Sequence, residues 1–201
     1  MNSVLILYPT LFKCYSKFER KVAHIVKNLE SLALIYMKDE NGFIAGFAQS
    51  NSLNFEMVSE WSLVSERMTH AIVFDDGEEL QEVTQKIRDK KIPLRVIKIA
   101  ITRVINIKKE TDYSSQRSTP VYEYIGRGSY WGNPYSMYEE GDDRDEVIRK
   151  YKYDFDFEKF PNKAKSEVYK LAGKRLGCFC KPQSCHGDVL ADFLNSWDDG
   201  K

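Results

Sequence analysis

The sequence predicts an α/β protein, with a Rossmann-like parallel sheet followed by a small α/β domain. Short apolar runs alternate with amphipathic stretches through the first half of the chain, as expected where crossover helices join parallel strands. A polar stretch without apolar periodicity follows, and a shorter series of strand and helix patterns comes after it. We therefore expect a Rossmann-like domain over residues 1–108, a linker over 109–119 and a small α/β domain over 120–201.

The first half contains four apolar runs of strand length. The first extends from Val4 to Tyr8 and ends at Pro9, which is typical of a strand covered on both faces. Ser16 can cap the helix that follows, because apolar residues recur at helical spacing up to Leu29. The same alternation predicts strands over 32–37, 70–74 and 93–99, and helices over 52–68 and 79–90.

The second half begins with a short strand over 121–125 and a glycine-rich turn. Asp142 or Asp143 can cap a helix over 144–153. The remaining patterns predict a helix over 163–172, a strand over 175–179 and a last helix over 186–197.

Charge and hydropathy exclude several functional classes. The 201 residues carry 30 basic and 30 acidic side chains, so the chain lacks the positive field of a protein that coats DNA. The run at Val4–Tyr8 is too short for a signal peptide, and no stretch reaches the roughly 18 apolar residues of a membrane span. We expect a cytoplasmic protein with no membrane partner. Its four cysteines would stay reduced there, which favours a metal site or reactive thiols.

The densest group of reactive side chains lies between Gly173 and Leu190, where three of the four cysteines and one of the three histidines occupy nine positions. Zinc prefers such ligands, and a Cys₃His set is available. Its members are Cys178, Cys180, Cys185 and His186. The spacing differs from that of a zinc finger, because Cys-x-Cys and adjacent Cys-His side chains project in divergent directions.

A second interpretation of the same segment is catalytic. Pro182 ends the strand, and Cys185 then falls at the N-terminus of a helix, where a thiol pKa is lowered. Cys185 is the candidate nucleophile, His186 its proton partner and Asp188 an orienting carboxylate. A third interpretation is that the cysteines simply fill a tight turn, since free cysteine is among the most buried residue types.

A second motif extends from Tyr124 to Tyr135. Gly126 and Gly128 flank Arg127, so the backbone can approach a ligand while the guanidinium binds a phosphate or carboxylate. Aromatic side chains in the same loop can stack on a base. The candidate substrate-binding residues are Gly126, Arg127, Gly128, Tyr130, Trp131, Asn133 and Lys174. The alternative is an ordinary aromatic-rich turn in which Trp131 packs into the core.

These two motifs resemble a family known from bacteria and phages as domain-of-unknown-function family 4326. The resemblance covers about 121–195 and lies in Gly-Arg, Trp-Gly-Asn-Pro, Arg-Asp-Glu and the Cys-aromatic-Cys segment that precedes Cys-His-Gly-Asp-Val-Leu. The first half resembles Rossmann-like nucleotide-binding proteins of the SLOG and deoxyribosyltransferase-like type. That likeness lies in the strand and acidic Gly turn at 71–77 and the strand at 91–96, whereas the glycine loop expected after the first strand is replaced by Tyr-Pro-Thr-Leu-Phe.

We therefore expect an enzyme acting on a nucleotide or a nucleic-acid-derived ligand, by hydrolysis or group transfer at a phosphate or N-glycosidic bond. Arg127 and the helix start at 185–188 would hold the anionic group. The two motifs should then meet in space. The rival hypothesis is a phage-type binding protein without catalysis, in which a zinc-stabilised module sequesters a nucleotide signal or a host protein.

Overall fold

The computed structural model describes residues 2–113, 115–137 and 141–200. It divides into two compact units. The first consists of the chain up to Ile99 together with the tail from Ser196, and the second extends from Ala100 to Asn195.

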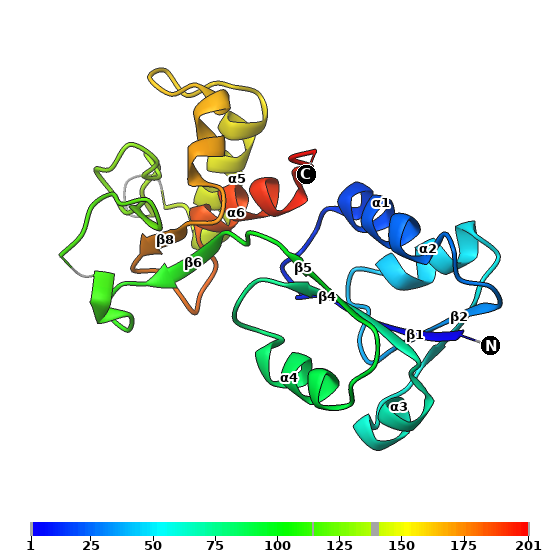
Figure 1. Ribbon diagram of the computed structural model, residues 1–201. Helices are drawn as coiled ribbons and strands as arrows, with labels where there is room; N and C mark the ends of the chain where they lie inside the picture. Colours follow the sequence, from blue (N-terminus) through cyan, green and yellow to red (C-terminus); the bar gives the residue numbers. More distant parts are fainter. Residues whose placement is uncertain (1, 114, 138–140, 201) are drawn as a thin grey trace. The chain divides into compact units, whose positions relative to one another are not determined.

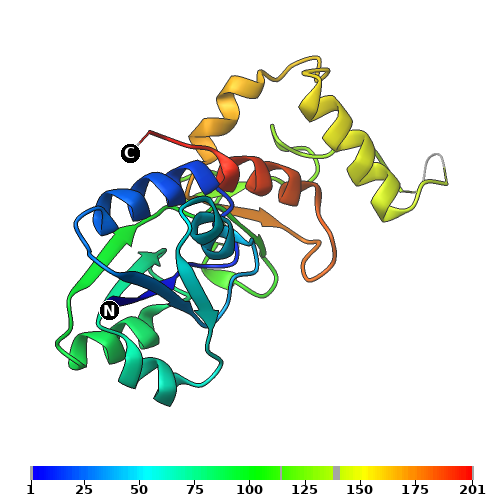
Figure 2. The ribbon, with the colours of Figure 1, turned by 90° about the vertical axis from the view of Figure 1, so that its right-hand side faces the viewer.

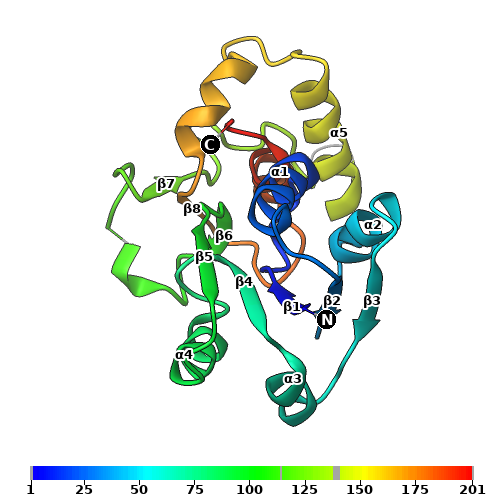
Figure 3. The same cartoon turned by 45° about the vertical axis from the view of Figure 1, so that its right-hand side comes forward.

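The first unit is built on a five-stranded parallel sheet with the strand order β3-β2-β1-β4-β5 (Figure 1). Its strands are β1 (Asn2–Leu7), β2 (Leu32–Tyr36), β3 (Asn54–Met57), β4 (His70–Asp75) and β5 (Leu94–Lys98). Four helices connect them, namely α1 (Tyr15–Val26), α2 (Phe43–Ser50), α3 (Trp61–Arg67) and α4 (Gln81–Asp89). Helices α1 and α2 cover one face of the sheet, and α3 and α4 cover the other (Figure 3). The predicted α/β class with a Rossmann-like sheet is confirmed.

The central strands are apolar because helices cover both of their faces. Val4 to Leu7 of β1 are all buried, and Leu5 and Leu7 belong to a core cluster with residues of α3 and α4. An aromatic cluster includes Phe18 of α1, whose ring stacks on Phe74 of β4 at a centroid distance of 5.3 Å. A strand that is buried on both faces needs a continuous apolar run, without polar residues at alternate positions.

The predicted helix over 52–68 is confirmed only at Trp61–Arg67 and is wrong before that. The structure forms β3 and then α3 in this stretch, because β3 pairs with β2 as an edge strand. All four residues of β3 are exposed, so the segment lacks the apolar run of a central strand. The short helix α2 was also missed.

The second unit contains a three-stranded parallel sheet with the order β6-β8-β7. The strands are β6 (Arg103–Asn106), β7 (Tyr122–Tyr124) and β8 (Arg175–Cys178), and the α-helices are α5 (Arg144–Asp156) and α6 (His186–Ser196). Two 3₁₀ segments, η1 (Thr111–Tyr113) and η2 (Lys165–Leu171), complete it. Asp143 caps α5 as expected, accepting the Glu146 backbone N–H at 2.8 Å. The predicted helix over 163–172 is a 3₁₀ helix.

The second unit begins at Ala100, ahead of the predicted linker over 109–119. Because β6 pairs with β8, this polar stretch connects two strands of one sheet and does not separate two domains. The misplacement arose because β6 has only four residues and begins and ends with polar side chains. Within the described residues, no helix combines the length and apolar character that crossing a bilayer requires.

Candidate functional site

The three clustered cysteines lie on a strand-turn-helix segment of the second unit. Figure 2 shows β8 running into a turn that leads back to α6. Cys178 is the last residue of β8, Cys180 lies in the turn and Cys185 directly precedes α6. Their Sγ atoms all lie within 4.8 Å of one another, and those of Cys178 and Cys180 are 3.5 Å apart. The turn thus brings together thiols whose spacing alone suggested divergence, and the cluster could hold a metal ion.

His186 is the first residue of α6, and its ring is buried beside this cluster. Its Nε2 lies 2.9 Å from the carbonyl oxygen of Ile125. A carbonyl can only accept, so Nε2 carries the proton and Nδ1 keeps its lone pair. Nδ1 lies 3.7 Å from the Cys185 Sγ. The contact with Ile125 thus directs a basic nitrogen toward the thiols.

Asp188 caps the helix start, and its negative charge also acts on the His186 ring, where it raises the pKa against the larger lowering by burial. Its Oδ2 accepts the backbone N–H of Cys185 at 2.9 Å, which is a reciprocal cap of the first turn. Its Oδ1 lies 2.6 Å from the Lys181 ammonium. The hydrogen bond and the ion pair of the Asp188 carboxylate thus go to the Cys185 backbone and to Lys181, and its effect on the His186 ring is electrostatic.

The thiols have different acidities. A hydrogen bond from the Cys185 thiol lowers the pKa of Cys178 to about 5. The same bond, together with burial, raises the pKa of Cys185 far above its ordinary value. Burial and the neighbouring Cys178 raise the pKa of Cys180, and burial lowers the pKa of His186. The expected lowering at Cys185 is therefore wrong: the helix N-terminus contributes only the Gly187 N–H at 3.4 Å, and the neighbouring sulfur outweighs it.

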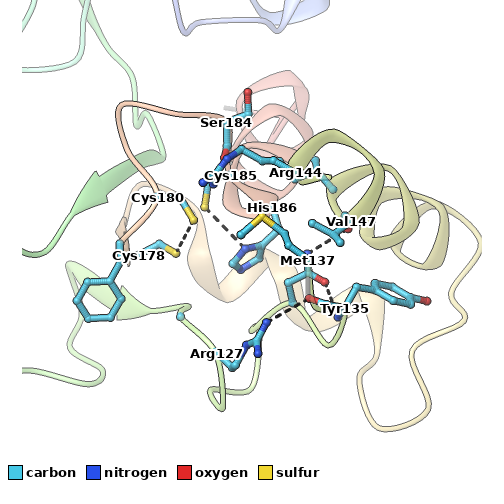
Figure 4. A pocket seen from close by; sticks show the side chains of 14 residues that line it. Arg127, Tyr135, Met137, Arg144, Val147, Cys178, Cys180, Ser184, Cys185 and His186 are labelled. Atoms are coloured by element: carbon cyan, nitrogen blue, oxygen red, sulfur yellow. Dashed lines mark hydrogen bonds between the residues drawn. The ribbon is translucent and has the colours of Figure 1, made fainter. Parts of the chain in front are cut away.

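The cysteine cluster and the Gly-Arg loop line one pocket of about 190 Å³ (Figure 4). Arg127 and Arg144 contribute guanidinium groups to it, and in Figure 4 they lie on opposite sides of the His186 ring. Arg127 Nη2 donates to the Tyr135 carbonyl at 3.5 Å, and Arg144 Nη1 donates to the Ser184 carbonyl at 3.2 Å. Each guanidinium has five N–H donors, so it can bind a ligand in addition to its carbonyl partner. The expectation that the two motifs meet is confirmed for Gly126, Arg127 and the thiols.

The other loop residues mainly hold the pocket wall together. Asn133 lines the pocket, but its Nδ2 donates to the Val147 carbonyl at 3.1 Å and its Oδ1 accepts the Tyr135 N–H at 3.0 Å. Gly126 is buried, and a Cβ there would collide with the Tyr124 ring. Gly128 has φ +80° and does not appear among the pocket-lining residues that the structure describes. Asn133 and these glycines therefore shape the loop.

Three predicted ligand-binding residues point elsewhere. Trp131 is 4% exposed and packs in the core, where its carbonyl accepts the Tyr151 hydroxyl at 3.0 Å. The Tyr130 hydroxyl donates to the Glu167 carboxylate on the surface. Lys174 precedes β8, at the end of the strand opposite Cys178, and pairs with Glu123 at 3.1 Å. The packing alternative thus holds for Trp131, and a stacking role for the two aromatic side chains is not supported.

Sequence reasoning missed several side chains of the pocket. Arg144 is the most informative of them, because it adds a second positive charge and also contacts the Cys180 thiol. Its position in the Arg-Asp-Glu motif at the start of a helix was a usable signal. Phe179 also lines the pocket and belongs to the Cys-aromatic-Cys segment, whereas Met137 and Val147 carried no such signal, because a single apolar residue in a sequence does not indicate a pocket.

Comparisons with known proteins also divide the chain into two parts, with the boundary at residue 105, inside β6. A model of the minimal SLOG domain matches residues 1–105, and a model described as a domain of unknown function (DUF4326) matches 105–196. A curated relative from Enterobacteria phage T4, an uncharacterized 12.4 kDa protein in the nrdA-td intergenic region, is 39% identical over 72 residues. The match covers 35% of this chain and 65% of the phage protein, which is less than two thirds of that relative. No solved structure matches the chain.

Both resemblances noted from the motifs are confirmed by these matches. SLOG domains are in general nucleotide-related. The chain therefore belongs to the family of minimal SLOG domain proteins, and its second half matches the domain of unknown function DUF4326.

Proposed function

We propose that the pocket of the second unit binds the phosphate group of a nucleotide or nucleic-acid-derived ligand. The observation that carries the proposal is that Arg127 and Arg144 line the same pocket as the three clustered thiols. Two guanidinium groups suit a phosphate, because each can donate two parallel N–H bonds to its oxygens. The membership of the first half in a nucleotide-related family supports this ligand class.

We further propose that the thiol cluster holds zinc. A tetrahedral ion with bonds of about 2.3 Å needs sulfur atoms roughly 3.8 Å apart, which agrees with thiols that lie within 4.8 Å of one another. We propose His186 as the fourth ligand, because its Nδ1 lies 3.7 Å from the Cys185 Sγ and its other ring N–H is held by a backbone carbonyl, the usual arrangement of a zinc-bound histidine. Among the described residues, the ligand atoms that all lie within 4.8 Å of one another are those of the three thiols, so the ring would have to move closer to bind the same ion. Reduced thiols are needed, so the proposal places the protein in the cytoplasm.

The proposed activity is hydrolysis or group transfer at a phosphate or N-glycosidic bond of the bound ligand. Arg127 and Arg144 would orient the anionic group and stabilise the charge that develops on it. Bound zinc would lower the pKa of a coordinated water if one position stayed open, and would brace the turn if His186 closed the set. We assign Cys185 and His186 to the metal set, and Asp188 to the cap that fixes the start of α6.

The second candidate function is binding without catalysis, to sequester a nucleotide signal or a host protein. The observation that favours it is the position of His186 Nδ1 beside Cys185, because a Cys₃His set leaves no open coordination position.

Product analysis separates the two candidates. The zinc-loaded protein is incubated with nucleoside 5′-monophosphates and a short RNA, and the mixtures are examined for released phosphate and free base. The enzyme proposal expects a product whose formation stops in an Arg127→Ala variant. Tight binding of these compounds with no product over many hours would contradict catalysis and leave the binding function.

A further inference from the structure

The pocket of the second unit is too small to enclose a whole nucleotide. Its volume is about 190 Å³, whereas sites that enclose a small organic ligand usually measure roughly 300–1,000 Å³. A phosphate held by Arg127 and Arg144 would occupy part of this space. A base joined to that phosphate would therefore lie outside the pocket, against its rim.

Phe179 supplies an aromatic ring at this rim. It stands between Cys178 and Cys180 and lines the pocket, yet its side chain is 50% exposed. Of the pocket-lining residues that the structure describes, it is the one large apolar side chain that is exposed. Its ring meets that of Tyr124 edge-on, with centroids 6.4 Å apart. A half-exposed ring can stack on any base, because every base has a π-face.

A cation lies beside this ring. The ammonium of Lys108, an exposed residue shortly after β6, lies 5.6 Å from the centroid of Phe179. Asn106 holds the two residues together, because its Nδ2 donates to the Phe179 carbonyl at 3.3 Å and its Oδ1 accepts the Lys108 backbone N–H at 2.9 Å. Within the described residues, this ammonium contacts the ring and not a carboxylate. Its charge is therefore available to an anion at the rim.

The order of these groups fits a strand better than a free nucleotide. Inside a nucleic-acid strand each base is flanked by two phosphates, whereas a nucleoside monophosphate has one. The pocket arginines suit the first phosphate, Phe179 suits the base and Lys108 suits the second phosphate. Positive groups next to an aromatic ring are typical of surfaces that bind single strands, in which the bases are free to stack on the protein.

We propose that the second unit binds single-stranded nucleic acid, with one phosphate at Arg127 and Arg144, the adjoining base on Phe179 and the next phosphate at Lys108. This proposal rests on the proposed phosphate site and names the ligand of that site as a strand.

The test is a set of calorimetric titrations of the full chain. The probes are ribose 5-phosphate, adenosine 5′-monophosphate and a 5′-phosphorylated tetranucleotide of adenine, made as RNA and as DNA. Phe179→Ala removes the ring, Phe179→Tyr keeps it, and Lys108→Ala removes the cation. The matched controls are Phe157→Ala and Lys109→Ala. Phe157 is 64% exposed and does not line the pocket in the described structure, and Lys109 is the exposed neighbour of Lys108.

The tighter tetranucleotide is expected to bind more strongly than the monophosphate, and the monophosphate more strongly than ribose 5-phosphate. Phe179→Ala should weaken both base-containing probes by roughly 5–150-fold, which corresponds to about 1–3 kcal/mol, and should leave ribose 5-phosphate within about twofold. Phe179→Tyr and Phe157→Ala should keep all affinities within about twofold. Lys108→Ala should weaken the tetranucleotide alone and reduce the slope of its log affinity against log salt by about 0.7, whereas Lys109→Ala should not.

Three results would overturn the proposal. Ribose 5-phosphate that binds as tightly as the tetranucleotide excludes base stacking and leaves the phosphate site intact. Equal effects of Lys108→Ala and Lys109→Ala mean that general positive charge attracts the strand. If none of the probes binds, the phosphate site itself is wrong, and the strand proposal fails with it.

Discussion

Replacing Cys178 by serine is expected to abolish metal binding and to unfold the second unit while the first unit stays folded. Cys178 is 5% exposed in the core of the second unit, and its sulfur lies in contact with that of Cys180. A structural zinc contributes an apparent binding energy of about 10–16 kcal/mol, which is comparable with or larger than the whole stability of a typical domain, about 5–15 kcal/mol. Zinc content and amide hydrogen exchange, resolved along the chain, measure both effects.

The matched control is Cys14→Ser in the first unit. Cys14 is as well buried, at 2% exposed, and its sulfur already lies 3.4 Å from the Ser16 hydroxyl. The substitution should cost at most about 1–3 kcal/mol, because the new hydroxyl has a partner. A Cys178→Ser protein with unchanged exchange protection over 100–195 would contradict the metal proposal.

Removing both guanidinium groups of the pocket is expected to abolish phosphate binding. A hydrogen bond to a charged group contributes about 1.5–3 kcal/mol, so Arg127→Ala and Arg144→Ala should each weaken a nucleoside 5′-monophosphate by roughly 10–150-fold. The double variant should bind too weakly to measure. Both groups line the pocket, and neither depends on the zinc for its charge.

Arg149→Ala is the control for this pair. Arg149 lies on α5 with Arg144, but it is exposed and pairs with Glu146 at 2.6 Å. Its removal should change the affinity by less than about twofold, because exposed ion pairs contribute little. Equal losses in the Arg144 and Arg149 variants would mean that general positive charge, and not the pocket, attracts the ligand.

The fold of the first unit could be predicted because its strands bury both faces. Apolar runs such as Val4–Leu7 are typical of strands that helices cover on both faces, and their alternation with helices predicts a parallel sheet. The strand β3 could not be recognised, because an edge strand with four exposed residues has no apolar signature. Its pairing with β2 is a tertiary effect.

The sequence predicted the kind of chemistry in the site, but only some of the residues that line it. The cysteine cluster and Arg127 stood out because cysteine, histidine and a Gly-flanked arginine are rare and chemically specific. Trp131 was ambiguous, since a tryptophan can stack on a base or fill a core, and only packing decides. Lys174 was wrongly expected in the site because it is close to Cys178 in the sequence. Lys174 lies just before β8 and Cys178 at its other end, and an extended strand rises about 3.3 Å per residue, so their side chains are far apart.

The central claim is that the thiol cluster and the two arginines form one ligand site around a metal. The most direct measurement is the visible spectrum of the cobalt-substituted protein during titration with a nucleoside 5′-monophosphate. Cobalt(II) in a tetrahedral thiolate site absorbs strongly, and its bands respond to a ligand bound beside it. We predict a thiolate-cobalt spectrum that the monophosphate changes in the native protein and leaves unchanged in Arg127→Ala. The absence of thiolate-cobalt bands, or bands that stay fixed while the nucleotide binds, would contradict the account.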